Sequence, residues 1–279
     1  MTEIQTGENF PKRFQTGVKA QFHCLHGFLG KPQDWSAFFP DSSLHYDLFS
    51  AARTPYPANL VEWGDAINRD ATVTPRPRIL LGYSLGGRIA LHALAQGPEL
   101  WSAAVIISAH PGLSSASEKK ERLKQDEMWA RRFVSDDWTK LMQDWNAQSI
   151  FAGLSQQRVE KEFSRSILSR VLVSCSLGQQ QDLRPSIQAH RIPILWISGE
   201  RDAKYRAIAD EVVEIRAQGQ NGSQTGIYSV CIPNAGHRVP WDQPKAFRDA
   251  IEKFIFNLGL EMPEKSQPEK FQKEEKNEF

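Results

Sequence analysis

The sequence has few cysteines and no long apolar run. Its three cysteines, Cys24, Cys175 and Cys231, are an odd number and form neither a CxxC pair nor a cluster with histidine. This pattern argues against a disulfide framework or a metal site, and it predicts reduced thiols in a cytoplasmic protein. No apolar segment approaches the roughly 20 residues that span a bilayer. The first residues also lack the apolar stretch of a signal peptide.

A large excess of charge of either sign is also missing. The 34 Lys and Arg residues nearly balance the 33 Asp and Glu residues, which leaves a formal net charge of +1. Such a balance gives no reason to expect binding to nucleic acid or to a membrane. We also expect no metal ion or other cofactor, and the sequence leaves the oligomeric state open.

Apolar segments alternate with helical patterns along most of the chain. With 279 residues, 40% of them hydrophobic, the chain is long enough for one α/β domain with an insertion. Segments typical of strands lie at 20–28, 43–49, 78–84, 102–108, 193–199 and 227–233, and helical patterns at 61–71, 86–96 and 242–259. This alternation predicts a mostly parallel central sheet with helices on both faces.

One region interrupts the alternation. Residues 111–185 contain no convincing strand and carry charged helical patterns at 117–133 and 156–172. We predict a helical cap there, inserted over the carboxyl edge of the sheet between core segments 1–110 and 186–258. Residues 259–279 are charged and poor in aliphatic side chains, which predicts a disordered tail.

A Gly-x-Ser-x-Gly motif, residues 82–86, lies between a predicted strand and a predicted helix. In that setting it is typical of a nucleophile elbow, a turn so tight that side chains at Gly82 and Gly86 would collide. The elbow places the Ser84 hydroxyl at a helix N-terminus, which favours negative charge. An incidental serine in a glycine-rich turn is the alternative, and the strand-to-helix setting makes it less favourable.

A serine hydroxyl needs a neighbouring base before it reacts. His237 follows the last predicted strand and Asp202 follows the one before it, which is the Ser, Asp, His order of the α/β-hydrolase fold. We predict that Asp202 orients His237 and that His237 activates Ser84. His110 is a minor alternative base. The other candidates are less suitable: His23, His26, His45, His92 and His190 as the base, and Asp182, Glu200 and Asp210 as the acid.

Two backbone donors are expected to stabilise a developing oxyanion. One is the N–H of Leu85, directly after the serine, and the other is the N–H of Phe28 in the loop after the first strand. Arg88 lies one helical turn after Ser84 and so can face the same pocket. An arginine in that position predicts an anionic substrate bound through its carboxylates.

The sequence also resembles a known family. The segments GYSLGGRIAL, HPGL, ERLKQDEMWARRF, DWNAQSIF, SGERDAKYRAIA and NAGH are similar to those of the MenH family, 2-succinyl-6-hydroxy-2,4-cyclohexadiene-1-carboxylate synthase of menaquinone biosynthesis. The resemblance runs from about residue 21 to residue 257. It implies an α/β-hydrolase fold and a lyase that eliminates pyruvate from 2-succinyl-5-enolpyruvyl-6-hydroxy-3-cyclohexene-1-carboxylate, a small substrate with three carboxylates.

The resemblance also implies roles for individual residues. Ser84 would act as a general base and not as a covalent nucleophile. Arg88 and Arg122 would hold carboxylates, and Tyr83 and Trp145 would line the pocket. Ordinary packing in the cap is an equally good account of Trp145.

The chain departs from the family after Asp47 and Leu48. Relatives continue with DLPGHGxS where this sequence has DLFSAARTPYP, so we expect a different edge of the substrate pocket. A carboxylesterase or a C–C bond hydrolase acting on a small acidic substrate is the main alternative function. A binding protein that retains the fold without catalysis is a third alternative, which the complete set of triad residues disfavours.

Overall fold

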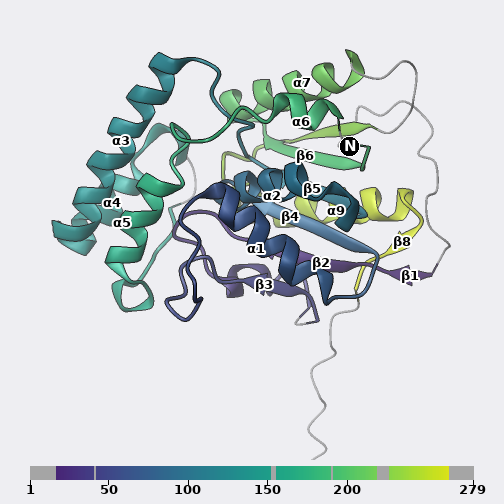
Figure 1. The fold of residues 1–279 in the computed structure, drawn as a ribbon, viewed down its shortest axis with the longest axis horizontal. Helices are drawn as coiled ribbons and strands as arrows, with labels where there is room; N and C mark the ends of the chain where they lie inside the picture. Colours follow the sequence, from purple (N-terminus) through teal and green to yellow (C-terminus); the bar gives the residue numbers. More distant parts are fainter. Residues whose placement is uncertain (1–16, 41, 152–154, 190, 219–225, 264–279) are drawn as a thin grey trace, which may run out of the picture.

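The computed structural model describes residues 17–40, 42–151, 155–189, 191–218 and 226–263. Its centre is a six-stranded sheet in which every neighbouring pair of strands is parallel (Figure 1). In spatial order the strands are β3 (Leu44–Tyr46), β2 (Gln21–Leu25), β4 (Arg78–Tyr83), β5 (Ala103–Ile107), β6 (Ile194–Gly199) and β7 (Ile227–Ile232). The prediction of a parallel α/β fold is therefore confirmed.

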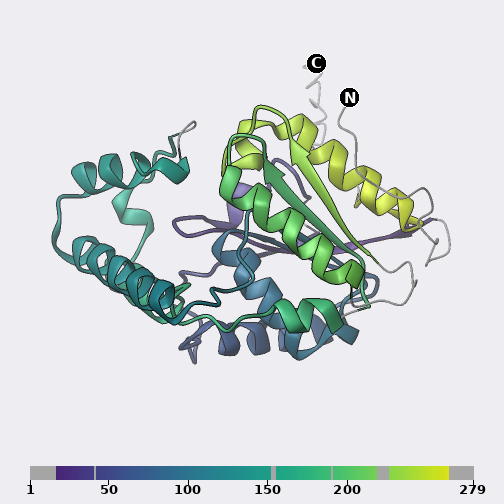
Figure 2. The ribbon, with the colours of Figure 1, turned by 90° about the horizontal axis from the view of Figure 1, so that it is seen from above.

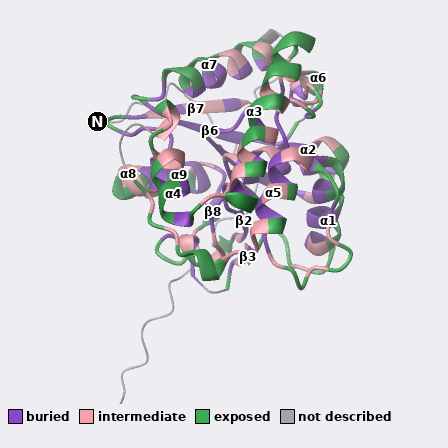
Figure 3. Cartoon of the chain, turned by 90° about the vertical axis from the view of Figure 1, so that its left-hand side faces the viewer, coloured by how far each residue is buried: buried purple, intermediate pink, exposed green. Residues whose placement is uncertain are grey.

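Helices cover both faces of this sheet (Figure 2). One face packs against α1 (Leu60–Thr72), α2 (Leu85–Gln96) and α7 (Ala203–Gln218), and the other against α9 (Pro244–Asn257), with the short helix α8 (Val239–Asp242) preceding α9. Alternate strand residues contribute to the two cores: Leu80 faces the first group of helices, and Ile79 faces the second. The central strands β4, β5 and β6 are consequently largely apolar and buried throughout, as parallel strands covered on both faces are, and Figure 3 shows the buried interior beneath the exposed outer faces of the helices.

Three helices between β5 and β6 lie to one side of the sheet (Figures 1 and 2). They are α3 (Ala116–Ser135), α4 (Trp138–Asn146) and α5 (Arg165–Ser174), in the segment predicted as a cap. The Ser115 and Asp137 side chains accept hydrogen bonds from the first turns of α3 and α4, which stabilises these helix starts. A fourth helix, α6 (Arg184–Ala189), packs against α7 of the core.

The structure differs from the sequence prediction before α5. Residues 156–164 are not α-helical, and this segment has contacts to both the core and the cap. Arg158 forms a bidentate ion pair with the Asp34 carboxylate, with N–O distances of 2.6 and 3.0 Å. The Arg158 carbonyl accepts a hydrogen bond from the Trp138 indole. Asp34 lies in the short 3-10 helix η1 (Pro32–Trp35). The other 3-10 segments are η2 (Pro98–Leu100), η3 (Ser149–Phe151) and η4 (Glu160–Glu162).

The beginning of the predicted tail also differs. Leu260–Glu261 form a short strand, β8, which pairs in parallel with β1 (Val18–Lys19). Residues 260 and 261 therefore belong to a two-stranded sheet, where the sequence predicts disorder. Residues 264–279, the remainder of that tail, lie outside the described residues.

The Arg158–Asp34 pair supports a test of how firmly the cap is attached to the core. Both side chains are nearly buried, with 9% and 12% of their surface exposed. We expect Arg158→Gln to lower the free energy of unfolding by about 3 kcal/mol, because it leaves the Asp34 carboxylate without its charge partner. Urea denaturation followed by tryptophan fluorescence measures this change.

A matched control is Lys245→Gln, which removes an ion pair with Asp249 whose two side chains are 88% and 54% exposed. It should leave the stability unchanged, because exposed pairs contribute little. Equal unfolding midpoints for the Arg158→Gln and Lys245→Gln variants would contradict the proposed importance of the buried pair.

Candidate active site

Ser84 occupies a strained turn between β4 and α2. Its backbone has φ 52° and ψ −109°, a conformation that residues other than glycine rarely adopt. The Ser84 N–H donates to the Ile107 carbonyl at 2.9 Å, and the Ser84 carbonyl accepts from the Arg88 N–H at 3.0 Å. Strain of this kind persists where surrounding structure enforces it, and it is common at active sites.

The glycines of the motif allow this turn to form. A Cβ on Gly82 would lie 2.7 Å from the Cα of Gly87, and a Cβ on Gly86 would lie 2.5 Å from the His26 carbonyl oxygen. Real Cβ atoms do not approach so closely. The predicted collision at Gly82 and Gly86 is therefore present, and Gly86 also allows the elbow to contact the loop after β2.

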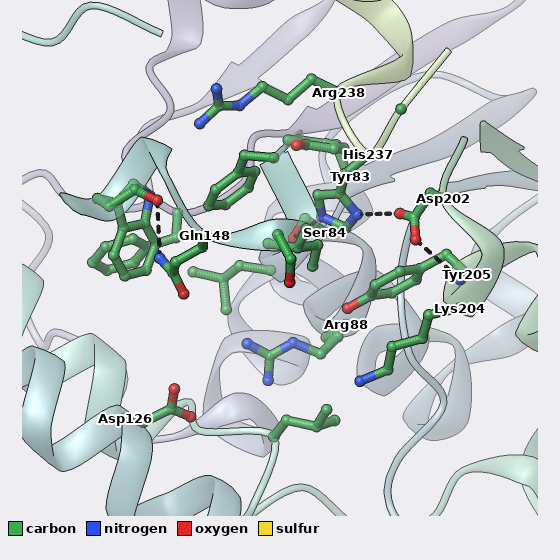
Figure 4. Close-up of a pocket in the computed structure, with 18 of the residues that line it drawn as sticks. Tyr83, Ser84, Arg88, Asp126, Gln148, Asp202, Lys204, Tyr205, His237 and Arg238 are labelled. Atoms are coloured by element: carbon green, nitrogen blue, oxygen red, sulfur yellow. Dashed lines mark hydrogen bonds and ion pairs between the residues drawn. The ribbon is translucent and has the colours of Figure 1, made fainter. Parts of the chain in front are cut away.

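The three predicted triad residues are joined by hydrogen bonds (Figure 4). His237 Nδ1 lies 2.7 Å from Asp202 Oδ2, and His237 Nε2 lies 3.2 Å from Ser84 Oγ. Both His237 and Asp202 are buried. With Nδ1–H donating to the carboxylate, Nε2 is left to accept the serine proton, which is the arrangement that a base needs.

The loops that carry these two side chains are fastened to each other. A Cβ on Gly199, the last residue of β6, would overlap backbone atoms of residues 235 and 236, so glycine permits the close approach. The Arg201 N–H donates to the Ala235 carbonyl at 2.8 Å, and the Gly236 N–H donates to Asp242 Oδ2 at 2.6 Å. Asp202 and His237 thus keep a fixed separation.

The loop after β2 brings Phe28 beside the serine. A Cβ on Gly27 would lie 3.4 Å from the Ser84 Cβ. His26 shapes this loop: its Nδ1 lies 2.8 Å from the Gly27 carbonyl, and its Nε2 accepts from the Leu48 N–H at 3.1 Å. Burial lowers the pKa of His26 to about 4, which keeps the ring neutral so that it can accept this hydrogen bond.

The backbone N–H groups of Phe28 and Leu85 are available as oxyanion donors. Within the described residues neither of them donates a hydrogen bond. Both residues line the cavity that contains Ser84. Unused backbone donors beside a serine are the elements from which an oxyanion hole is built.

A cavity of about 590 Å³ lies between the carboxyl edge of the sheet and the cap helices. All nine site residues predicted from the sequence line it: Phe28, Tyr83, Ser84, Leu85, Arg88, Arg122, Trp145, Asp202 and His237. The cap contributes Arg122 and Trp145, and the core contributes the others. The structure thus brings together side chains that lie as much as 209 positions apart in the chain.

The two predicted carboxylate-binding arginines have different partners. Arg88 NH1 donates to the Cys175 carbonyl at 2.6 Å and lies 3.4 Å from Gln180 Oε1, both of which are neutral acceptors. Arg122 Nε instead donates to both carboxylate oxygens of Asp126, at 3.0 and 2.9 Å. The charge of Arg122 is therefore largely compensated within the protein, whereas these hydrogen bonds leave the charge of Arg88 uncompensated.

Aromatic side chains form the cap side of the cavity. The Trp145 ring centroid lies 5.1 Å from that of Phe28 and 5.9 Å from that of Phe151. Phe151 in turn lies edge-on to His237, with centroids 5.9 Å apart. Trp145 therefore both packs in the cap and lines the pocket. Tyr83 packs beside the His237 ring at 5.6 Å.

Sequence reasoning missed several polar residues of the pocket, and three of them follow triad residues directly or closely in the chain. Lys204 and Tyr205 follow Asp202 in the first turn of α7, and Arg238 follows His237. Arg238 is buried, donates to Asn146 Oδ1 in the cap at 2.8 Å, and lies 4.2 Å from the centre of the Phe151 ring. Their proximity in sequence to the triad was the available signal, but it does not tell which side chains face the cavity.

The remaining histidines have other surroundings. The His110 Nδ1 accepts from the Gly112 N–H at 3.0 Å, and burial lowers its pKa to about 3. His23 contacts Tyr46 and Thr74 inside the core, and His92 is buried in α2. His45 lies in β3, and none of these rings lines the cavity. His190 falls outside the described residues.

The atypical segment after Asp47 does not reach the cavity directly. None of the described residues 47–59 lines it. Phe49 packs edge-on against Phe28 with centroids 5.6 Å apart, so this segment supports the pocket from behind. The Tyr56 hydroxyl donates to the Leu48 carbonyl at 2.6 Å and holds the segment against the core.

Comparison with known proteins agrees with this geometry. Residues 24–250 match the model of the alpha/beta hydrolase family. A 2-succinyl-6-hydroxy-2,4-cyclohexadiene-1-carboxylate synthase of Pectobacterium atrosepticum is 30% identical over 250 residues, which is 83% of this chain and 92% of that protein. The chain belongs to the MenH family of the α/β hydrolases. The resemblance inferred from the sequence motifs is thereby confirmed.

Two further relatives support the same grouping. The synthase of the same name from Escherichia coli O157:H7 is 34% identical over 241 residues, 79% of this chain and 87% of that one. A solved structure of MenH from S. aureus superimposes with a TM-score of 0.74, covers 88% of this chain and 97% of that chain, and is 20% identical. At that identity the structural likeness supports the fold of this MenH-family member.

The described residues carry neither a metal-binding cluster nor a helix that could span a membrane. No group of three or more His, Cys, Asp or Glu side chains there is arranged to hold a metal ion. No helix there is both long and apolar enough to span a membrane.

The His237–Asp202 hydrogen bond can be tested without substrate. We expect a proton resonance far downfield of the backbone amides in the one-dimensional NMR spectrum, because the buried Nδ1–H donates to a carboxylate at short distance. The signal should disappear in His237→Gln and Asp202→Asn. It should persist in His92→Gln, the matched control for removal of a buried imidazole. Loss of the signal in His92→Gln alone would contradict the assignment.

Proposed function

We propose that this MenH-family protein eliminates pyruvate from 2-succinyl-5-enolpyruvyl-6-hydroxy-3-cyclohexene-1-carboxylate to give 2-succinyl-6-hydroxy-2,4-cyclohexadiene-1-carboxylate, a step of menaquinone biosynthesis. The observation that carries the proposal is a hydrogen-bonded Ser84–His237–Asp202 array at the wall of a cavity with cationic side chains. The synthases named above, similar over most of the chain, support it.

Ser84 is the general base of this reaction. His237 takes the Ser84 proton at Nε2, and Asp202 stabilises the imidazolium that forms. The Ser84 oxygen then removes the ring proton adjacent to the succinyl ketone. The electron pair of that C–H bond shifts through the ring double bond and breaks the C–O bond to the enolpyruvyl group. The departing enolpyruvate gains a proton to become pyruvate, and the ring is left as a diene.

The Phe28 and Leu85 N–H groups stabilise the charge that develops in this step. Removal of a proton beside a ketone places negative charge on the ketone oxygen. Two fixed donors beside Ser84 lower the energy of that enolate more than that of the neutral ketone, and this difference accelerates the reaction.

The substrate is a small polycarboxylate, and the charges of the cavity wall suit it. Five cationic side chains line the cavity against two carboxylates: Arg88, Arg122, Arg201, Lys204 and Arg238 against Asp126 and Asp202. Arg88 binds a carboxylate with its uncompensated charge, and Arg122 binds a second one through its terminal N–H groups, because its bonds to Asp126 use only Nε. Tyr83 and Trp145 contact the apolar parts of the ring. Simple esters would gain nothing from such a wall.

A carboxylesterase or a C–C bond hydrolase is the second candidate. Its specific support is the 3.2 Å Ser84–His237 contact, which would equally activate the serine as a nucleophile. The two candidates differ in what the cationic wall contributes. An acyl transfer to Ser84 needs no carboxylates on the substrate, whereas binding of the enolpyruvyl substrate uses them.

Pyruvate release tests the proposal. The wild-type protein should convert the enolpyruvyl substrate well above the spontaneous rate, followed by coupled reduction of pyruvate with lactate dehydrogenase. Ser84→Ala should lower kcat by about 1,000-fold, because general-base catalysis contributes on the order of 10²–10⁴-fold.

Ser117→Ala removes an exposed hydroxyl at the start of α3 and is the matched control, with unchanged kcat. Turnover of short acyl esters without any pyruvate release would favour the hydrolase instead.

A further inference from the structure

The first turn of α7 places the polar side chains of Lys204 and Tyr205 in the cavity, next to the triad. Asp202 Oδ1 accepts from the Tyr205 N–H at 3.3 Å, and the Asp202 carbonyl accepts from the Arg206 N–H at 3.0 Å. The residue that orients His237 thus also begins α7. Figure 4 shows the Lys204 and Tyr205 side chains directed toward the space beside the Arg88 guanidinium.

Two positive charges in this part of the cavity lack a carboxylate partner. The hydrogen bonds of Arg88 go to the neutral oxygens of Cys175 and Gln180, and Gln180 is itself fixed by its bond to the His110 carbonyl at 2.9 Å. Lys204 forms no ion pair with any described residue. Arg122, by contrast, is paired with Asp126.

The charge of Arg122 acts on both of these cations. Burial, followed by the charge of Arg122, lowers the pKa of Lys204, and the same two causes lower the pKa of Arg88. Both cations are therefore poorly solvated and lie within electrostatic reach of the same third cation. A bound anion would relieve the repulsion, so the region is prepared for negative charge before any ligand arrives.

Tyr205 supplies a neutral donor to the same region. Its ring lies 4.6 Å from the His237 ring, which fixes it against the triad, and Figure 4 shows its hydroxyl on the side of Arg88. No hydrogen bond of this hydroxyl to a described residue occurs. The guanidinium, the ammonium and the phenol therefore all present donors to one part of the cavity, from α2 and from α7.

We propose that Arg88, Lys204 and the Tyr205 hydroxyl form a binding site for a ligand with two carboxylates, and that Lys204 determines the preference for a dicarboxylate over a monocarboxylate. The proposal rests on the proposed function for its substrate class. One carboxylate can satisfy the Arg88 fork by itself. Lys204 stands on a different helix, so its charge is used only when the ligand carries a second carboxylate.

Succinate and butyrate are suitable probes, because they share a four-carbon chain and differ by one carboxylate. Isothermal titration at constant ionic strength measures the affinity of the full-length protein for each. We expect the wild-type protein to bind succinate about tenfold more tightly than butyrate, in line with one charge-assisted hydrogen bond. Lys204→Gln should bring this ratio close to one, and Lys204→Arg should restore most of it.

Two further variants test whether a specific site, and not the overall positive potential of the protein, causes the preference for succinate. Lys124→Gln removes an exposed cation of α3 that does not line the cavity, and it should keep the wild-type ratio. Tyr205→Phe should weaken succinate binding by a few-fold. In turnover, Lys204→Gln should raise KM for the enolpyruvyl substrate about tenfold and leave kcat nearly unchanged, because Lys204 binds and does not react.

The proposal is overturned if the wild-type protein shows no preference for succinate, or if Lys204→Gln and Lys124→Gln reduce the ratio equally. Because binding is measured without turnover, the two proposals can fail separately. Pyruvate release with an unchanged ratio in Lys204→Gln would reject the dicarboxylate site alone. A collapsed ratio without pyruvate release would retain this site and reject the reaction.

Discussion

The hydrogen bond between His237 Nε2 and Ser84 Oγ is the interaction on which the proposed function of this molecule depends. It joins a turn after β4 to a loop after β7, 153 positions later in the chain. The rest of the fold holds its two ends in place: glycines allow the elbow to form, and the backbone contact from Arg201 to Ala235 holds the histidine loop against the Asp202 turn. A parallel sheet makes this possible, because all its strands end at the same edge.

The cavity above that bond has two chemically different sides. Toward the cap, Phe28, Trp145 and Phe151 present aromatic surface. Toward α2 and α7, Arg88 and Lys204 present positive charge with few internal carboxylates to balance it. A substrate with a carbon ring and several carboxylates has the same division, and this complementarity would orient the ring so that one of its protons faces Ser84.

The parts of the site that depend on local sequence could be predicted, and those that depend on tertiary contacts could not. Ser84 is identifiable because only glycine fits at Gly82 and Gly86, a constraint visible in five consecutive letters. His237 follows from the order of elements. Lys204 was not identified, because the direction of a side chain in the first turn of a helix depends on how the helix is docked.

Tertiary contacts also limited the prediction of the fold from the sequence. The pattern at 156–172 predicts helix throughout, yet the ion pair of Arg158 with Asp34 and the Trp138 hydrogen bond hold its first half in another path. The pairing of β1 with β8 joins two-residue strands from opposite ends of the chain, which no periodicity reveals. The segment after Asp47 supports the pocket through Phe49 instead of forming its edge.

Whether Ser84 acts as a base or as a nucleophile is tested most directly by intact-protein mass spectrometry during turnover. Samples of the wild-type protein would be quenched while the enolpyruvyl substrate is being consumed. The account predicts pyruvate in solution and a protein mass that stays unmodified throughout, because the Ser84 oxygen exchanges only a proton with the substrate. A substrate-derived mass on Ser84 that forms and decays at the rate of turnover would contradict it.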